Sequence, residues 1–306
     1  MTKVLVATEK PFAKVAVDGI KRIIEEAGLE FALLEKYTDK KQLLDAVKDA
    51  NAIIIRSDQI DAEVLDAAKE LKIVVRAGAG YDNVDLAAAT AHNVCVMNTQ
   101  GQNSNAVAEL VMGMLVFMYR NLFNGASGSE LMGKKLGILA YGNVGRNVAR
   151  IAKGFGMEIY AYDQFVSAAD IEKEGVKAVA SRDALFETCD IVSLHIPKTP
   201  ETVKSINAEL LSKMPKGACL INTARQEVID EEGICKFMAE RTDFKYATDI
   251  KPTNDAEMAK FEGRYFTTPK KMGAQTAEAN INAGLAAARQ IVDFIKNGNE
   301  KFRVNK

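Results

Sequence analysis

Residues 136–145 read LGILAYGNVG, an apolar strand-length run that leads through a glycine-containing turn into a segment with helical periodicity, NVGRNVARIAKG. Asp163 ends the next apolar run, EIYAYD, about 20 residues further on. This order of strand, glycine turn, helix and acidic residue is the fingerprint of a dinucleotide-binding βαβ unit, here with Ala140 at its first glycine position. The stretch therefore predicts a parallel α/β sheet of the Rossmann type.

Each residue of this fingerprint has a physical role in such a unit. Gly142 would let the backbone approach a pyrophosphate, and Gly145 would let the helix pack closely on the strand. The amides of Asn143 and Val144 would face the phosphates at the helix N-terminus. Asp163 would accept hydrogen bonds from the adenosine ribose, and no arginine follows within the next three residues to pair a 2′-phosphate. The sequence therefore favours NAD over NADP.

Composition limits the remaining possibilities. The chain has 306 residues, of which 48% are hydrophobic, enough for two domains around separate cores. A formal net charge of −1 lacks the basic excess that nucleic-acid binding needs. The apolar runs fall short of the roughly 18 residues that a membrane span requires. We therefore expect a soluble, cytoplasmic protein with neither a nucleic-acid partner nor a membrane partner.

Cysteine and histidine are scarce and scattered. The four cysteines lie in apolar stretches without CxxC spacing, which is typical of reduced core thiols. The two histidines are too few for a His-based metal cluster, so no metal is expected. These residues are Cys95, Cys189, Cys219 and Cys235, and His92 and His195.

Short β-branched runs alternate with helical patterns along most of the chain, which indicates parallel α/β architecture throughout. The Ser104/Asn105 cap signal precedes an apolar helical run too uniform for a surface helix, so we expect it to be buried between domains or subunits. A last long helix covers about 275–297. We predict a first domain of residues 1–98 plus 279–306 and a nucleotide-binding domain of residues 99–278.

Six stretches, taken together and in order, resemble the D-isomer-specific 2-hydroxyacid dehydrogenases. They are RAGAGYDNVDLAAAT, NTQGQNSNAVAEL, GILAYGNVGRNVA, LHIPKTPETVKSIN, KMPKGACLINTARQEVIDEEG and GAQTAEA. Within the family the chain is most similar to short D-3-phosphoglycerate dehydrogenases, which lack C-terminal serine-sensing domains. The resemblance implies an NAD-binding Rossmann domain and a flavodoxin-like substrate-binding domain, whose closure would exclude water from the reacting atoms. It also implies a homodimer or a higher homo-oligomer formed through the NAD-binding domain.

The resemblance assigns roles to particular residues. Arg225 in the motif NTAR would hold the substrate carboxylate or carbonyl oxygen during hydride transfer. Asp249, in YATDI, would contact the nicotinamide end of the cofactor. The further cofactor-binding residues implied are Ala79, His195, Ile196, Thr223, Ala224, Gly273 and Arg225 itself.

The chain departs from the family pattern at two catalytic positions. The usual Pro-His before the final Gly-Ala is replaced by Pro269-Lys270-Lys271-Met272, which puts Lys271, or its neighbour Lys270, where the proton donor should be. The usual Glu-Pro pair is missing from DIKPTNDAEMAKFEG, where Asp255 and Glu257 are both candidates for the carboxylate and Glu257 is preferred. A lysine base must lose its proton before oxidation, which costs about 4 kcal/mol from a reference pKa of about 10.4 to pH ~7.5. We therefore expect alkaline-shifted oxidation.

The substrate is expected to be a small phosphorylated 2-hydroxy acid. Arg56 and Arg76 both end strands of the first domain, and two arginines suit a phosphate plus a carboxylate. The glycine-rich loop after Arg76, with Ala77 and Gly78, could present backbone amides to a carboxylate, and Asn103 would line the same site by resemblance. The resulting hypothesis is oxidation of D-3-phosphoglycerate to 3-phosphohydroxypyruvate, the entry to serine synthesis. The alternatives are a glyoxylate or hydroxypyruvate reductase, a D-lactate dehydrogenase, and a non-catalytic NAD-binding regulatory protein.

Overall fold

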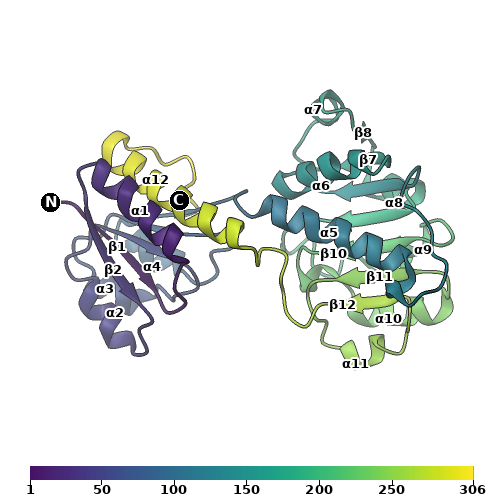
Figure 1. Cartoon of the computed structure of the whole chain (residues 1–306), viewed down its shortest axis with the longest axis horizontal. Helices are drawn as coiled ribbons and strands as arrows, with labels where there is room; N and C mark the ends of the chain where they lie inside the picture. Colours follow the sequence, from purple (N-terminus) through teal and green to yellow (C-terminus); the bar gives the residue numbers. More distant parts are fainter. Residues whose placement is uncertain (306) are drawn as a thin grey trace. The chain divides into compact units, whose positions relative to one another are not determined.

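The computed structural model describes residues Met1–Asn305 and shows two fully parallel β-sheets, each belonging to its own compact unit (Figure 1). Unit 1 comprises Met1–Asn103 and Gln275–Lys306, and unit 2 comprises Ser104–Ala274. The fold class predicted from the sequence, two Rossmann-like α/β domains with parallel sheets, is confirmed. Within residues 1–305, no helix is both long enough and apolar enough to cross a membrane.

Unit 1 contains a five-stranded sheet of order β2-β1-β3-β4-β5, which is the flavodoxin-like order. Its strands are β1 Lys3–Thr8, β2 Glu30–Glu35, β3 Ala52–Ile55, β4 Ile73–Arg76 and β5 Cys95–Asn98. Its helices are α1 Lys14–Glu26, α2 Lys40–Ala46, α3 Ala62–Ala67, α4 Leu86–Ala91 and α12 Ala277–Asn297. The inner strands β3 and β4 are almost wholly buried Ile and Val, as expected for a sheet covered on both faces.

The last helix completes unit 1 although it follows unit 2 in the sequence. α12 lies beside α1 on one face of the sheet, and α2, α3 and α4 cover the other face. Thr276 caps its start by accepting a hydrogen bond from the Ala279 amide, and Gly298 ends it in the left-handed conformation at φ 66°. The predicted range of 275–297 has the observed end, Asn297, and begins two residues before the observed start, Ala277, which is within the usual uncertainty of helix ends.

Unit 2 contains a seven-stranded sheet of order β12-β11-β10-β9-β6-β7-β8. Its strands are β6 Lys135–Leu139, β7 Glu158–Tyr162, β8 Lys177–Ala178, β9 Ile191–Leu194, β10 Cys219–Asn222, β11 Lys245–Thr248 and β12 Tyr265–Thr267. Its α-helices are α5 Ser104–Tyr119, α6 Asn143–Gly154, α7 Ala168–Lys173, α8 Arg182–Thr188, α9 Ala208–Ser212, α10 Glu231–Glu240 and α11 Asp255–Met258. Two short 3₁₀ turns, η1 Asn121–Phe123 and η2 Gln226–Val228, complete the unit.

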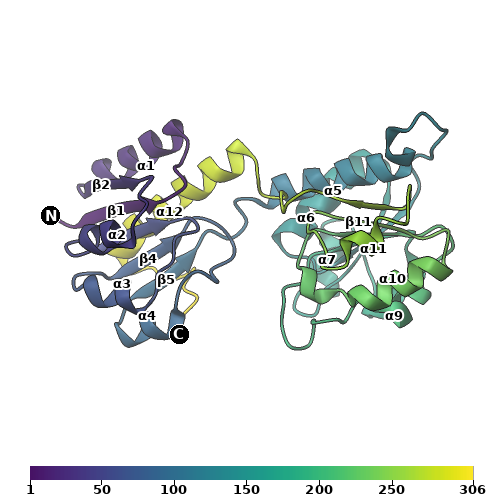
Figure 2. The same cartoon turned by 90° about the horizontal axis from the view of Figure 1, so that it is seen from below.

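Helices cover both faces of this second sheet. α5, α6 and α7 enclose one hydrophobic cluster, and α8, α9 and α10 enclose another on the opposite face. Figure 2 shows α5 and α10 on opposite sides of β11. The uniformly apolar α5 is largely buried, and within its own unit it packs against α6 and the strands β10 and β11. Its burial between domains or subunits stays a prediction.

Candidate functional site

Functional side chains predicted from the sequence gather at the carboxyl ends of the strands of unit 2. In a parallel sheet the strand order reverses at one point, here between β6 and β9, and ligands of such folds bind outside the carboxyl ends beside that point. The loops that leave these ends carry the fingerprint turn after β6, Asp163 after β7, His195 after β9, Arg225 after β10, Asp249 after β11 and Lys271 after β12.

The fingerprint turn has the geometry that a dinucleotide phosphate needs. Ala140 takes the left-handed conformation, φ 78°, that glycine usually supplies. A Cβ on Gly145 would lie 2.5 Å from the Ala140 carbonyl oxygen, so only glycine allows α6 to pack this closely. A Cβ on Gly142 would meet nothing within 4 Å, and no side chain caps the N-terminus of α6. Because no side chain caps this helix, the first amides of α6, those of Asn143 and Val144 included, remain available to donate to a phosphate.

Asp163 holds this turn in place. Its Oδ2 accepts a hydrogen bond from the Tyr141 amide at 2.7 Å, and its Oδ1 accepts bonds from the amides of Phe165 and Val166. The carboxylate is thereby fixed at the end of β7 beside the glycine turn. Because a carboxylate has about four lone-pair sites, acceptor capacity remains on its oxygens for a ribose hydroxyl.

Asp249 is fully buried, and only one of its two carboxylate oxygens has a hydrogen-bond partner among the described residues. Its Oδ2 accepts a hydrogen bond from the Gly273 amide at 2.7 Å, whereas its Oδ1 has no partner among the described residues. Burial raises the pKa of this carboxyl, while the Gly273 amide and the nearby Lys271 charge act in the opposite direction. A buried acceptor without a partner calls for a donor from a ligand, and the carboxamide at the nicotinamide end of NAD is such a donor.

A second buried group with an unused polar atom is Thr223, whose Oγ1 also has no partner in the described chain. Together with Gly142 and Asp249, it shows that the residues present fit NAD from the phosphates to the nicotinamide end. Bound NAD would supply a hydride acceptor at this edge of the sheet.

The loop after β10, residues 223–230, is called the Arg225 loop. Asn222 shapes its start, because its Oδ1 accepts a bond from the Ala224 amide and its Nδ2 donates to the Arg225 carbonyl. Arg225 Nη1 donates to the Ala224 carbonyl oxygen at 2.9 Å, and Lys271 Nζ donates to the same oxygen at 3.1 Å. The two cationic nitrogens are therefore at most about 6 Å apart. Two positive groups converge where an oxygen that gains negative charge could be bound.

His195 lies at the end of β9 and is not suited to donate a proton. Its Nε2 shares a hydrogen bond of 3.0 Å with Ser193 Oγ, and burial lowers its pKa to about 3. The imidazole is therefore neutral at physiological pH. His92, in unit 1, bonds to Asp66 and to the Ala88 carbonyl on the surface.

The two carboxylates considered for the catalytic position lie on α11. Asp255 accepts a hydrogen bond from the Tyr265 hydroxyl at 2.9 Å and pairs with Lys251 at 3.0 Å. The Lys251 ammonium lowers the pKa of Asp255. Glu257 is exposed and lines a hollow of unit 2 beside Cys235.

In unit 1, the predicted substrate residues surround the ends of β3 and β4. Arg56 is held by its own unit: Nη1 donates to the carbonyls of Lys10 and Pro11, and Nη2 donates to Asn280. Arg76 donates through Nε to the Arg56 carbonyl, and its guanidinium crosses directly over Gly78, where a Cβ would collide with Nη1. The Nη groups of Arg76 have no acceptor among residues 1–305.

The glycine-rich loop beside this arginine pair is fixed by a residue that the sequence reasoning missed. Asn98, at the end of β5, donates from Nδ2 to the Ala79 carbonyl at 2.6 Å. The short helix α4 follows this loop and is capped by Asp85, whose side chain accepts a hydrogen bond from the Ala88 amide. Asn103 is the last residue of unit 1 before the chain enters unit 2, and it is half-buried.

The family model for "D-isomer specific 2-hydroxyacid dehydrogenase, NAD binding domain" matches residues 116–269, which include the fingerprint turn, Asp163, Arg225 and Asp249. The chain belongs to this family. The predicted family and its cofactor NAD are confirmed by this match.

Individual relatives of this 2-hydroxyacid dehydrogenase carry different names. The chain is 34% identical to a D-3-phosphoglycerate dehydrogenase of Methanocaldococcus jannaschii over 91% of this chain and 56% of that protein. It is 31% identical to a hydroxypyruvate reductase of Thermotoga maritima over 86% of this chain and 90% of that protein. It thus spans about half the length of the curated D-3-phosphoglycerate dehydrogenases that it matches.

Among solved structures, an NAD⁺-bound 3-phosphoglycerate dehydrogenase of Entamoeba histolytica is similar over the whole chain. The sequence identity is 49%, the TM-score is 0.86, and the match covers 100% of this chain and 99% of that one.

Proposed function

We propose that this 2-hydroxyacid dehydrogenase catalyses the NAD-dependent oxidation of D-3-phosphoglycerate to 3-phosphohydroxypyruvate, the first step of L-serine biosynthesis. The observation that carries the proposal is the convergence of Arg225 and Lys271 on the Ala224 carbonyl. It puts an anion-binding group and a proton-transferring group side by side, next to the half-satisfied Asp249. The whole-chain similarity to the Entamoeba histolytica 3-phosphoglycerate dehydrogenase supports the choice of substrate.

In this proposal Arg225 binds the substrate carboxylate or the oxygen at C2, and Lys271 moves the proton. During oxidation, the neutral Lys271 amine takes the proton of the C2 hydroxyl while the hydride leaves C2 for NAD⁺. In the reverse direction, the ammonium returns that proton to the oxygen of the 2-oxo acid. Arg225 stabilises the negative charge on that oxygen in the transition state.

The structure favours Lys271 over Lys270 for this role. Lys271 Nζ reaches the Arg225 loop, whereas the side chain of Lys270 makes no hydrogen bond or ion pair with the described residues. For the carboxylate we propose Glu257, because Asp255 is already engaged by Lys251 and Tyr265.

The arginines of unit 1 are proposed to select a phosphorylated substrate. Arg76 presents Nη donors without an acceptor among residues 1–305, beside the Gly78 turn. Arg56 donates hydrogen bonds to three acceptors of unit 1, which fix its guanidinium, and it would add a positive charge to the site. With Ala77 and Asn103, these groups would hold the phosphate and the carboxylate.

A second candidate is reduction of an unphosphorylated 2-oxo acid. It is supported by the similarity to the hydroxypyruvate reductase of Thermotoga maritima, because the match covers 90% of that protein. The two activities differ in what they demand of the unit 1 arginines. A phosphorylated substrate needs Arg76, whereas hydroxypyruvate lacks the group that it would bind.

The test is NADH-dependent reduction of 3-phosphohydroxypyruvate and of hydroxypyruvate by the wild type, Lys271→Ala and the matched control Lys270→Ala. We expect strong preference for the phosphorylated compound and near-wild-type activity in Lys270→Ala. In Lys271→Ala, kcat should fall by at least about 100-fold, because a general acid–base contribution is about 10²–10⁴-fold. Preference for hydroxypyruvate would favour the second candidate. Absence of turnover on any 2-oxo acid, with NADH still bound, would favour a non-catalytic regulatory role.

We also propose that the chain forms a homodimer through unit 2. Phe123, Met132 and Phe155 expose apolar side chains on this unit, and light scattering after gel filtration would give the mass. A monomeric mass at micromolar concentration would refute the dimer.

A further inference from the structure

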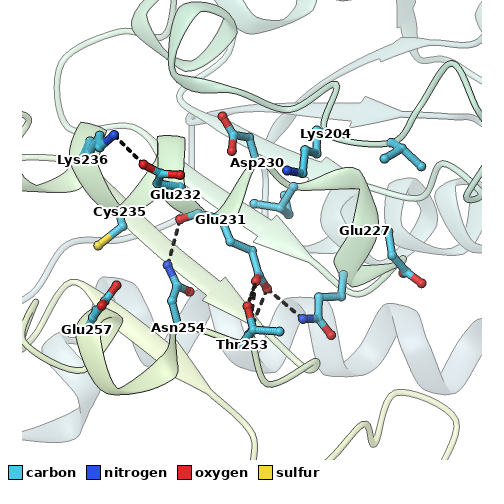
Figure 3. Close-up of a pocket in the computed structure, with 13 residues that line it drawn as sticks. Lys204, Glu227, Asp230, Glu231, Glu232, Cys235, Lys236, Thr253, Asn254 and Glu257 are labelled. Atoms are coloured by element: carbon cyan, nitrogen blue, oxygen red, sulfur yellow. Dashed lines mark hydrogen bonds and ion pairs between the residues drawn. The ribbon is translucent and has the colours of Figure 1, made fainter.

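One glutamate connects the Arg225 loop to the neighbouring loop after β11. We call residues 249–254, between β11 and α11, the Thr253 loop. Glu231, the first residue of α10, accepts a hydrogen bond from Gln226 Nε2 at 2.9 Å, and Gln226 directly follows Arg225. The same carboxylate accepts bonds from the Thr253 amide, at 3.1 and 3.2 Å, and from the Thr253 hydroxyl. Figure 3 shows the bonds from Thr253 meeting at the Glu231 carboxylate.

The backbone of Glu231 makes the connection stronger. Asn254 Nδ2 donates to the Glu231 carbonyl at 2.9 Å, and Asn254 is the residue before α11 (Figure 3). Among residues 1–305, every hydrogen bond between the segment 226–231 and the segment 251–254 ends on Glu231. Removal of this one carboxylate therefore leaves these two segments joined by a single hydrogen bond, from Asn254 to the Glu231 carbonyl.

The other side of the Arg225 loop does not depend on Glu231. The amides of Lys204 and Ile206 donate to the carbonyls of Glu227 and Val228, at 2.8 and 3.0 Å. These bonds fix the distal part of the loop against the segment after β9. At the start of the loop, Asn222 donates to the Arg225 carbonyl, and the Asp249 amide donates to the Asn222 carbonyl at 3.2 Å. Gln226 and Glu231 add a second tie, between the residue after Arg225 and the far end of the Thr253 loop.

We infer that Glu231 is a positioning residue that sets the placement of Arg225 by tying its loop to the Thr253 loop. This inference rests on the proposed function, in which Arg225 contacts the substrate. Displacement of a catalytic group by about 1 Å can cost about 10²-fold in rate. A charged carboxylate is suited to this position because donors to an ionised acceptor form shorter and stronger bonds than donors to a neutral one.

The direct test compares Glu231→Gln with Glu232→Gln, the same substitution at the next residue. Glu232 pairs only with Lys236 among the described residues and its side chain is 80% exposed, so it is a matched control. The amide introduced by Glu231→Gln would present at least one N–H to the Thr253 donors or to Gln226, so it cannot accept all the present bonds. We expect kcat to fall at least tenfold in Glu231→Gln and less than twofold in Glu232→Gln. The Kd for NADH should stay within twofold of wild type in Glu232→Gln. In Glu231→Gln it should rise by a smaller factor than kcat falls, because the fingerprint turn at β6 lies outside both loops, whereas Thr223 and Asp249 lie within them.

A second pair of variants separates positioning from general loss of structure. Thr253→Val removes the hydroxyl, and Thr253→Ser keeps it. We expect Thr253→Val to lower kcat and Thr253→Ser to keep kcat near the wild-type value. The double variant Glu231→Gln/Thr253→Val should have the same kcat as Glu231→Gln alone, because both changes break the same tie. Independent, multiplying losses would overturn the inference, as would kcat of Glu231→Gln equal to that of Glu232→Gln. The inference would also be overturned if kcat and NADH affinity fell together across these variants in proportion to their melting temperatures, because that would indicate general loss of structure.

Hydrogen exchange tests the tie without any assumption about the substrate. We expect the amides of residues 226–229 and of Lys251, Thr253 and Asn254 to exchange faster in Glu231→Gln than in Glu232→Gln. If the wild type reduces no 2-oxo acid, the proposed function fails, and this measurement still decides whether Glu231 holds the two loops together. Equal exchange in the two variants would refute the tie itself.

Discussion

Two glycines of the fingerprint turn have separable roles, and alanine substitutions should separate them. A Cβ on Gly145 would lie 2.5 Å from the Ala140 carbonyl oxygen and 2.9 Å from Ile138 Cγ2. Ile138 is fully buried and the Ala140 atom belongs to the backbone, so neither contact can yield without a shift of α6. Ordinary contact begins near 3.4 Å, so the helix must move by roughly 1 Å.

Overpacking of this kind costs about 1–3 kcal/mol. For a domain of about 150–250 residues, each 1 kcal/mol lowers the melting temperature by roughly 2–4 °C, so Gly145→Ala should melt about 2–12 °C lower. Gly142→Ala should not melt lower, because its Cβ meets no atom within 4 Å and its φ of −83° suits alanine.

NADH affinity should fall in both variants, for different reasons. In Gly145→Ala the amides at the start of α6 move with the helix, whereas in Gly142→Ala the new methyl group occupies the space through which a pyrophosphate approaches. We expect at least a tenfold rise in Kd for Gly142→Ala, measured by NADH fluorescence, without loss of stability in differential scanning fluorimetry. Wild-type affinity in Gly142→Ala, or an unchanged melting temperature in Gly145→Ala, would refute this reasoning.

Three further predictions follow from the same structure. The unfolded state binds a proton at His195 near pH 6.5 and the folded state only near its pKa of about 3, so acid should destabilise the fold through this group. At pH 5, this group should lower the free energy of unfolding by about 1–2 kcal/mol. Urea titrations at pH 7 and pH 5 should show that His195→Asn loses less unfolding free energy than the wild type on acidification. An equal loss in both proteins would count against a neutral imidazole in the folded state. Gly78→Ala should displace the Arg76 guanidinium and raise KM for a phosphorylated substrate at least tenfold, with NADH affinity unchanged as the control; an unaltered KM would remove Arg76 from the substrate site. Oxidation should accelerate between about pH 7 and pH 10, because a lysine base must first be neutral; a flat rate over that range would argue against Lys271 as the base.

The sequence determined the fold class and much of the site because both depend on local chemistry. A Gly-rich turn between an apolar strand and a helix has few backbone solutions, so residues 136–145 and Asp163 predicted their own geometry. Arg225, Asp249 and Lys271 were assigned instead by the resemblance to the 2-hydroxyacid dehydrogenases. The structure shows that each of them follows a strand of the same parallel sheet, and the carboxyl ends of such strands share one edge.

Other features depend on side chains that meet only after folding. The sequence does not show that Lys271 reaches the Ala224 carbonyl across 47 positions, because this contact depends on the pairing of β10, β11 and β12. Nor does it show that Glu231 accepts hydrogen bonds from the Thr253 amide and hydroxyl. In the sequence, Glu231 cannot be distinguished from any other glutamate at the start of a helix, because its neighbours in space are set by folding. His195 likewise reads as an ordinary titratable residue, and only the burial that folding brings lowers its pKa to about 3. Local pattern thus decided which elements form and which residues end them, whereas the tertiary packing decided which of those residues share a hydrogen bond or lose contact with water.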